Sequence, residues 1–157
     1  MLIIDSREKS KLAKLVMQKA KALSIKYEQR WIEIGDYVFD DVCFEATDFL
    51  GSVLSKRMWT QLDNMDRHYK TNIVIIHGDM QEAIMNVIEN APSKMPIGTR
   101  SIMLNNKFLG AIGRITLDTD IKPFWVQSEE EAALIITAIC KMKPITRETI
   151  EPQVFRR

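Results

Sequence analysis

The chain has 157 residues, of which 46% are hydrophobic and 27% are charged, and its formal net charge is +1. These values are ordinary for a soluble globular protein, and the length is typical of one domain. The net charge neither demands nor excludes a nucleic-acid partner, so any basic surface must come from local clustering.

The cysteines and the N-terminal sequence both favour an intracellular protein. Cys43 and Cys140 lie in apolar runs without a Cys-x-x-Cys partner, which predicts two reduced, buried thiols. The first ten residues lack the basic region and apolar core of a signal peptide. No apolar run approaches the ~18 residues that a membrane span needs. We therefore expect a cytoplasmic protein with no membrane partner.

The first third of the chain predicts a strand, a helix and an antiparallel meander. Residues 2–5 form a short apolar run typical of a buried strand, and Ser10 is placed to cap the helix that follows. Partial alternation predicts a strand over residues 25–34. After a break at Gly35-Asp36, residues 37–39 and 42–46 predict a hairpin around Asp40-Asp41.

The rest of the chain alternates helices with strands. Residues 48–70 predict two helices, of which Asp48 caps the first. Residues 72–78 predict a buried strand, and Asp79 and Glu82 form a capping box that opens a helix to about Glu89. The remaining predicted segments are a loop at 91–98, a helix at 100–118, a strand at 122–126, a helix capped by Ser128 and Glu131, and a tail at 143–157.

Strands interleaved with helices indicate an α/β fold with helices on both faces of a central sheet. The early hairpin makes that sheet mixed rather than purely parallel. We expect one domain over residues 1–142, followed by a C-terminal tail over 143–157.

Three acidic residues lie where predicted strands begin or end. Asp36 precedes one strand of the hairpin, Glu45 ends the next, and Asp5 ends the first strand of the chain. The hairpin would bring Asp36 and Glu45 side by side, with Asp5 as a third ligand. Magnesium prefers such oxygen ligands and can activate water beside a phosphate. The alternative interpretation is a set of solvated carboxylates at a sheet edge.

Several blocks in the same order resemble the nuclease domain of the XPF family of structure-specific endonucleases, including archaeal XPF and Hef. The resemblance covers about residues 2–142. The matching blocks are "IIDSRE" (Asp5, Arg7, Glu8), "GDY" (Gly35, Asp36, Tyr37), Glu45 with Asp48 and "FLGS" (Gly51, Ser52), "RMWTQ" (Arg57, Gln61), "NMDRHYKTNIVIIHGD" (64–79) and "PFWVQSEEEAALII" (123–136).

The resemblance implies a restriction-endonuclease-like fold and a DNA endonuclease dependent on Mg²⁺ or Mn²⁺ that cuts branched or junction DNA in repair, recombination or replication. Asp5, Asp36 and Glu45 would bind the metal, and Arg7 and Glu8 would support the site. A dimer, with itself or with another chain, is implied through the late helices and the strand between them.

One basic residue of the family motif is replaced. The family places its catalytic lysine two residues after the glutamate, where this chain has Thr47, and only two residues separate Glu45 from Asp48. Lys56 or Arg7 are candidates for the missing positive charge. The alternative to an enzyme is a catalytically silent nuclease-fold module that binds DNA or pairs with an active partner.

A basic cluster falls on the predicted helix after this motif. Lys56, Arg57, Arg67 and Lys70 are candidate phosphate contacts, which position DNA without reading its sequence. The alternative is an ordinary solvated helix face.

Overall fold

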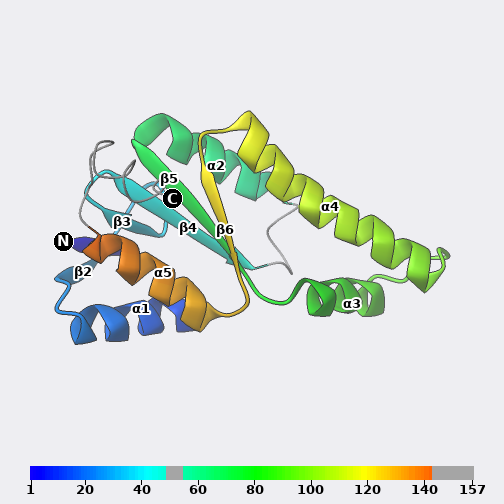
Figure 1. Ribbon diagram of the computed structural model, residues 1–157, viewed down its shortest axis with the longest axis horizontal. Helices are drawn as coiled ribbons and strands as arrows, with labels where there is room; N and C mark the ends of the chain where they lie inside the picture. Colours follow the sequence, from blue (N-terminus) through cyan, green and yellow to red (C-terminus); the bar gives the residue numbers. More distant parts are fainter. Residues whose placement is uncertain (49–54, 143–157) are drawn as a thin grey trace, which may run out of the picture.

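A computed structural model of the protein describes residues 1–48 and 55–142, and it contains a six-stranded sheet with helices on both faces (Figure 1). The elements are β1 (Leu2–Asp5), α1 (Lys11–Ala22), β2 (Tyr27–Arg30), β3 (Tyr37–Phe39), β4 (Val42–Asp48), α2 (Lys56–His68), β5 (Thr71–His77), α3 (Met80–Asn90), α4 (Ile97–Asp118), β6 (Lys122–Val126) and α5 (Glu129–Lys141).

The strand order is β2-β1-β3-β4-β5-β6. Strand β3 runs antiparallel to β1 and β4, and the other neighbouring pairs are parallel. This arrangement confirms the predicted α/β class and the mixed sheet. It also places β4, which carries Glu45, in the interior of the sheet with hydrogen-bonded neighbours on both sides.

Two apolar cores lie on opposite faces of the sheet. Alternate residues of β1, β3 and β4, among them Ile4, Tyr37 and Phe44, pack with α1 and α5 on the first face. On the second face, Cys43 and the β5 residues Val74 and Ile76 pack under α2, α3 and α4. Side chains that alternate with those of the first core therefore point toward the α2 face.

Local capping chemistry explains where several helices begin. Ser10 Oγ accepts a hydrogen bond from Ala13 N at 3.2 Å, and Ser128 Oγ accepts one from Glu131 N at 3.2 Å. Asp79 Oδ1 accepts from the backbone N–H groups of residues 81 and 82. These contacts confirm the N-caps that the sequence predicts.

Some predicted boundaries are wrong. Strand β2 is only Tyr27–Arg30, because the backbone of Ile32 bonds to the side chains of Asp5 and Arg7 instead of to a strand. Strand β4 does not end at Glu45. It continues to Asp48, because its parallel pairing with β5 extends that far.

The helix predicted to start at Asp48 is also wrong at its first residue, since Asp48 belongs to β4. Residues 49–54, including Gly51 and Ser52, lie outside the described residues. Helix α2 begins at Lys56, with Ser55 Oγ accepting a hydrogen bond from Met58 N at 3.2 Å.

Helix α4 begins three residues earlier than predicted, at Ile97 after Pro96. Proline suits a helix start, whereas Gly98 in the first turn weakens the local helix signal. The tail predicted over 143–157 lies outside the described residues. Within residues 1–48 and 55–142, no helix has the length and hydropathy to cross a membrane.

Candidate active site

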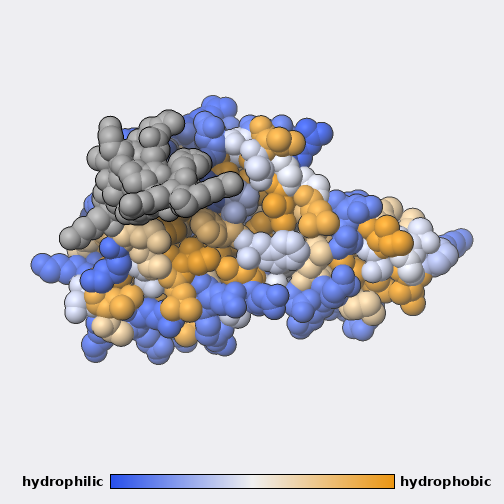
Figure 2. All heavy atoms as spheres, in the orientation of Figure 1, coloured by the Kyte–Doolittle hydropathy of each residue, from blue (hydrophilic) through white to orange (hydrophobic). Residues whose placement is uncertain are grey.

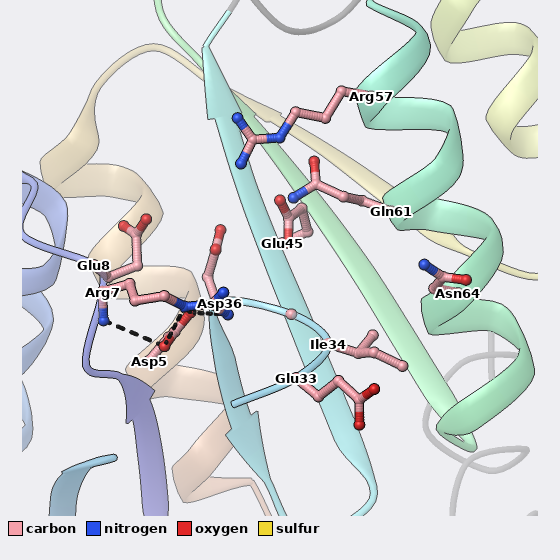
Figure 3. A pocket seen from close by; sticks show the side chains of 11 residues that line it. Asp5, Arg7, Glu8, Glu33, Ile34, Asp36, Glu45, Arg57, Gln61 and Asn64 are labelled. Atoms are coloured by element: carbon pink, nitrogen blue, oxygen red, sulfur yellow. Dashed lines mark hydrogen bonds and ion pairs between the residues drawn. The ribbon is translucent and has the colours of Figure 1, made fainter. Parts of the chain in front are cut away.

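Strand alternation brings the three predicted carboxylates to the α2 face of the sheet. Leu2 and Ile4 of β1 belong to the first core, so Asp5 points the other way. By the same alternation Asp36, which precedes Tyr37, and Glu45, which follows Phe44, point to the α2 face. Figure 3 shows the carboxylates on β1, β3 and β4 beside α2.

Backbone hydrogen bonds fix Asp36 beside Glu45. The Asp36 N–H donates to the carbonyl of Phe44 at 2.9 Å, and the Ala46 N–H donates to Asp36 Oδ2 at 2.9 Å. Glu45 is only 6% exposed. Asp36 is therefore bonded to the two residues that flank Glu45, and both carboxylates lie on a single hairpin.

Gly35 allows the chain to enter this hairpin. Its φ is +89°, in the left-handed region that L side chains rarely adopt, and a Cβ built on it would overlap Cys43 Sγ. The Gly-Asp pair is thus required by the backbone path and by packing on the neighbouring strand.

The electrostatics of the pair favour a cation. Burial raises the pKa of Asp36, and the nearby carboxylates Glu8 and Asp5 raise it further. Burial and the charge of Asp36 raise the pKa of Glu45 well above its usual value. Arg57 acts in the opposite direction on both groups. Both carboxylates would ionise more readily with a bound cation.

Asp5 is held differently, by Arg7. Arg7 Nη2 lies 2.8 Å from Asp5 Oδ2, and Arg7 Nε lies 3.0 Å from the same oxygen. Burial raises the pKa of Asp5, but hydrogen bonds from Arg7 and from the Ile32 N–H outweigh it and hold the pKa below its usual value. Asp5 is therefore an ionised carboxylate already paired with a guanidinium.

Helix α2 closes the other side of the cavity. Arg57, Gln61 and Asn64 recur at helical spacing and line it, and in Figure 3 Arg57 and Gln61 extend from α2 toward Glu45. The cavity has a volume of about 280 Å³. Its lining residues are Asp5, Arg7, Glu8, Glu33, Ile34, Gly35, Asp36, Glu45, Arg57, Gln61 and Asn64.

Residue 47, where the family motif has its lysine, lines an adjoining cavity of about 200 Å³. Thr47 lines it together with Asp36, Glu45 and Arg57, and the Thr47 side chain points to the same face as Glu45. Arg57 is thus the basic side chain that shares both cavities with the carboxylates. Neither cavity has a lysine in its lining.

The predicted basic cluster is divided by the helix. Arg57 faces the cavity, whereas Lys56 and Arg67 lie about a quarter-turn away, on the exposed side of α2. Arg67 pairs with Asp63 one turn earlier at 3.2 Å, and Lys70 lies exposed between α2 and β5. The structure therefore does not bring these four residues together at the carboxylates.

The donor set fits a magnesium-type cation. Within residues 1–48 and 55–142, no three His, Cys, Asp or Glu side chains form a ready-made metal cage. Mg²⁺ is commonly held by one or two carboxylates while water and phosphate oxygens complete its shell. The half-buried Asp36 and the buried Glu45 meet that need, and the Arg7-bound Asp5 stands beside them.

Sequence reasoning missed three residues near the site. Asn64 continues the Arg57–Gln61 stripe and could have been found from the i, i+4 and i+7 spacing of the three residues on α2. Glu33 and Trp31 come from the segment predicted as strand, and they face the α2 side only because that segment leaves the sheet after Arg30.

Comparison with known proteins identifies relatives of this chain. Residues 4–139 match the ERCC4 domain family. A protein of Methanocaldococcus jannaschii named as an ATP-dependent RNA helicase is 31% identical over 148 residues, which are 92% of this chain and 16% of that protein. The 3′-flap repair endonuclease Xpf of Saccharolobus solfataricus is 26% identical over 141 residues, or 87% of this chain and 53% of that enzyme.

The fold has a counterpart among solved structures. XPF from Aeropyrum pernix in complex with DNA superposes with a TM-score of 0.66 at 19% identity, over 96% of this chain and 65% of the XPF chain. A second structure of XPF from the same organism superposes with a TM-score of 0.65 at 18% identity. The chain spans only part of the length of each of these proteins. It belongs to the ERCC4 domain family, with the fold of an XPF nuclease domain.

Proposed function

We propose that this chain is a DNA endonuclease that depends on Mg²⁺ or Mn²⁺ and cuts branched or junction DNA in repair, recombination or replication. The observation that carries the proposal is the pair of half-buried Asp36 and buried Glu45 at a polar cavity. Two carboxyl groups whose pKa values are both raised by burial and by neighbouring carboxylates are costly to keep without a cation between them. Membership of the ERCC4 domain family supports DNA as the substrate.

Asp36 and Glu45 would hold the metal, with Asp5 assisting from β1. When bound, the metal supplies an activated water and offsets negative charge on the scissile phosphate. Arg7 would keep Asp5 ionised and oriented through its two hydrogen bonds. Glu8 and Gln61 line the same cavity and would position water or a phosphate oxygen.

Arg57 would supply the positive charge that the motif lysine gives in other family members. It shares the Thr47 cavity with both carboxylates, whereas Lys56 faces away and Arg7 is occupied by Asp5. A guanidinium stays protonated, so it would act by fixing a water or phosphate oxygen and not by removing a proton. Lys56, Arg67 and Lys70 would contact the DNA backbone farther from the cut.

Cleavage of labelled fork, 3′-flap and plain duplex DNA tests the proposal. We expect cutting of the branched substrates with Mg²⁺ or Mn²⁺ and none with EDTA. Asp36→Asn and Glu45→Gln should abolish cutting while retaining the parent's circular dichroism spectrum. Metal-dependent cutting that survives in both variants would place the active site elsewhere.

A second candidate function is favoured by Thr47. It is 7% exposed beside Glu45, and no lysine lines either of the two cavities that contain both Asp36 and Glu45. A catalytically silent module that binds DNA or pairs with an active partner would show this substitution. DNA binding by the parent without any cleavage, on all three substrates and with either metal, would select this function.

The late elements carry an apolar surface suited to the predicted dimer. Strand β6 is an edge strand of the described sheet, at the side opposite β2, and its Phe124 and Trp125 are exposed. Leu117 of α4 and Leu134 of α5 are also exposed, and Figure 2 shows apolar side chains on the face between α4 and α5. We propose that a second copy or a related chain covers this surface.

A further inference from the structure

An exposed tryptophan stands next to the candidate active site. Trp31 is 62% exposed, which is unusual for a side chain with so large an apolar area. The segment that carries it is not loose, because the next residue, Ile32, bonds through its N–H to Asp5 and through its carbonyl to Arg7. The exposed Trp31 ring is therefore attached to a backbone segment that is held in place at the next residue.

Trp31 lines an open depression of about 420 Å³ on the α2 face. Ile3 of β1, Val38 of β3 and Tyr69 line it together with Trp31, and Arg30 and Glu33 line it as well. The depression thus brings apolar and aromatic side chains together with one basic and one acidic side chain.

Arg7 connects this depression to the carboxylates. Its guanidinium carbon lies 5.5 Å from the centre of the Trp31 ring, and the same guanidinium bonds to Asp5. Glu33 lines both the depression and the carboxylate cavity. A ligand on Trp31 would therefore be separated from the Asp5 carboxylate by the Arg7 side chain alone.

We propose that Trp31 is a stacking platform for an unpaired base of the DNA substrate. This inference rests on the proposed function, which supplies branched DNA as the ligand. It adds which part of that DNA this site would bind. A base can stack on an exposed ring only when its own face is free, so the platform selects single strand over duplex. Arg30, whose exposed guanidinium pairs with Glu28 at 3.3 Å, would exchange that contact for an adjoining phosphate.

The depression also contains a feature that opposes DNA. Glu33 places a negative charge beside the path of the phosphates. Its removal should strengthen binding of the same strand that Trp31 holds. Opposite effects from two neighbouring residues would be difficult to explain by a general change in folding.

Binding without metal tests the proposal independently of cleavage. The full chain is titrated in EDTA into fluorescein-labelled oligo(dT) and into a blunt duplex, and anisotropy is recorded. Trp31→Ala should weaken oligo(dT) binding about 5- to 100-fold, the range for loss of one base–aromatic stack. Trp31→Phe should restore most of the affinity, and Glu33→Gln should increase it. Duplex affinity should change less than about twofold.

Tyr27→Ala is the matched control, because Tyr27 is an exposed aromatic residue at the opposite end of β2. It should bind like the parent. Equal oligo(dT) affinity in Trp31→Ala and the parent, equal losses on both DNAs, or no binding by the parent would each overturn the proposal. A change of oligomeric state in Trp31→Ala without a change in DNA affinity would assign Trp31 to a protein interface instead.

Cleavage separates the two proposals. If the parent cuts no DNA but its oligo(dT) binding depends on Trp31, the endonuclease proposal fails and the platform stands. If the parent cuts forks and Trp31→Ala cuts and binds them equally well, the platform alone fails.

Discussion

At the scale of single residues, Gly35 is the position where the backbone tolerates the least change. Gly35→Ala combines a left-handed φ with an overlap at Cys43 Sγ. We expect the free energy of unfolding to fall by about 1 kcal/mol or more, measured by urea titration. Gly98→Ala is the control, because a Cβ there meets nothing within 4 Å and alanine is the better helix former, so this variant should be at least as stable as the parent. Equal stability of both variants would contradict the described path into the hairpin.

Arg57 is predicted to replace the missing lysine in function. Arg57→Ala should lower kcat about 100- to 1,000-fold, as loss of one preorganised donor does in other enzymes. Adding Thr47→Lys to that variant should restore part of the activity, because residue 47 opens on the same cavity.

Single-turnover cleavage of a fork measures both effects. Lys56→Ala serves as the control, since Lys56 lies on the exposed side of α2, and it should alter DNA affinity more than the rate of the chemical step. A full rate in Arg57→Ala would remove Arg57 from the mechanism.

The raised pKa values of Asp36 and Glu45 predict a pH dependence of stability. In the metal-free folded state these groups keep their protons above the ordinary carboxyl pKa of about 4, while the unfolded chain releases them. The folded state then binds more protons, so stability falls as pH rises from about 4 through neutral pH.

Thermal melts in EDTA at several pH values measure this effect. Glu45→Gln should lose less stability over that window than the parent. Mg²⁺ should raise the melting temperature of the parent at pH 8 and leave Asp36→Asn unchanged. A parallel decline in the parent and in Glu45→Gln would show that the pair does not cause the pH dependence.

At the scale of elements, the capping residues predict where helices depend on a side chain. Asp79 Oδ1 accepts from Gln81 N at 2.8 Å and from Glu82 N at 3.1 Å. Asp79→Ala should therefore cost about 1 kcal/mol in urea unfolding. Glu89→Ala, an exposed change in the last turn of the same helix, should cost much less. Equal costs would argue against a capping role.

Elements with strong local signals could be predicted from sequence. The apolar runs gave β1 and β5, and the caps at Ser10, Asp79 and Ser128 marked three helix starts. The predicted hairpin of β3 and β4 brings Asp36 beside Glu45, and the structure has this arrangement. Asp5, from a distant part of the chain, lines the same cavity.

Features set by tertiary contacts could not be predicted in this way. The extent of β4 depends on its pairing with β5, and the end of β2 depends on bonds from Ile32 to Asp5 and Arg7. The choice of Arg57 over Lys56 depends on the rotation of α2 against the sheet. The buried face of α2, formed by Met58, Leu62 and Met65, sets Lys56 on the opposite side of the helix, but it does not report that the carboxylates lie on the side of Arg57.

At the scale of the whole molecule, the apolar surface on α4, β6 and α5 predicts self-association or pairing with a related chain. Light scattering should give a dimer mass for the parent at micromolar concentration. Leu134→Glu should shift it toward monomer, because it puts a charge into that surface. Leu23→Glu, at the exposed end of α1, should not. A monomeric parent would leave pairing with a different chain as the remaining form of this proposal.

The position of β4 inside the sheet predicts different rates of amide hydrogen exchange in the two halves of the site. Its amide hydrogens are shielded by β3 and β5, so Glu45 should lie among the residues slowest to exchange with deuterium. The segment from Trp31 to Ile34 lies outside the sheet, and the side chains of Asp5 and Arg7 hold its backbone at Ile32, so its other amides should exchange sooner than those of β4. The carboxylate side of the site would then stay fixed, while the exposed side chains of Trp31 and Glu33 adjust to junctions of different shape.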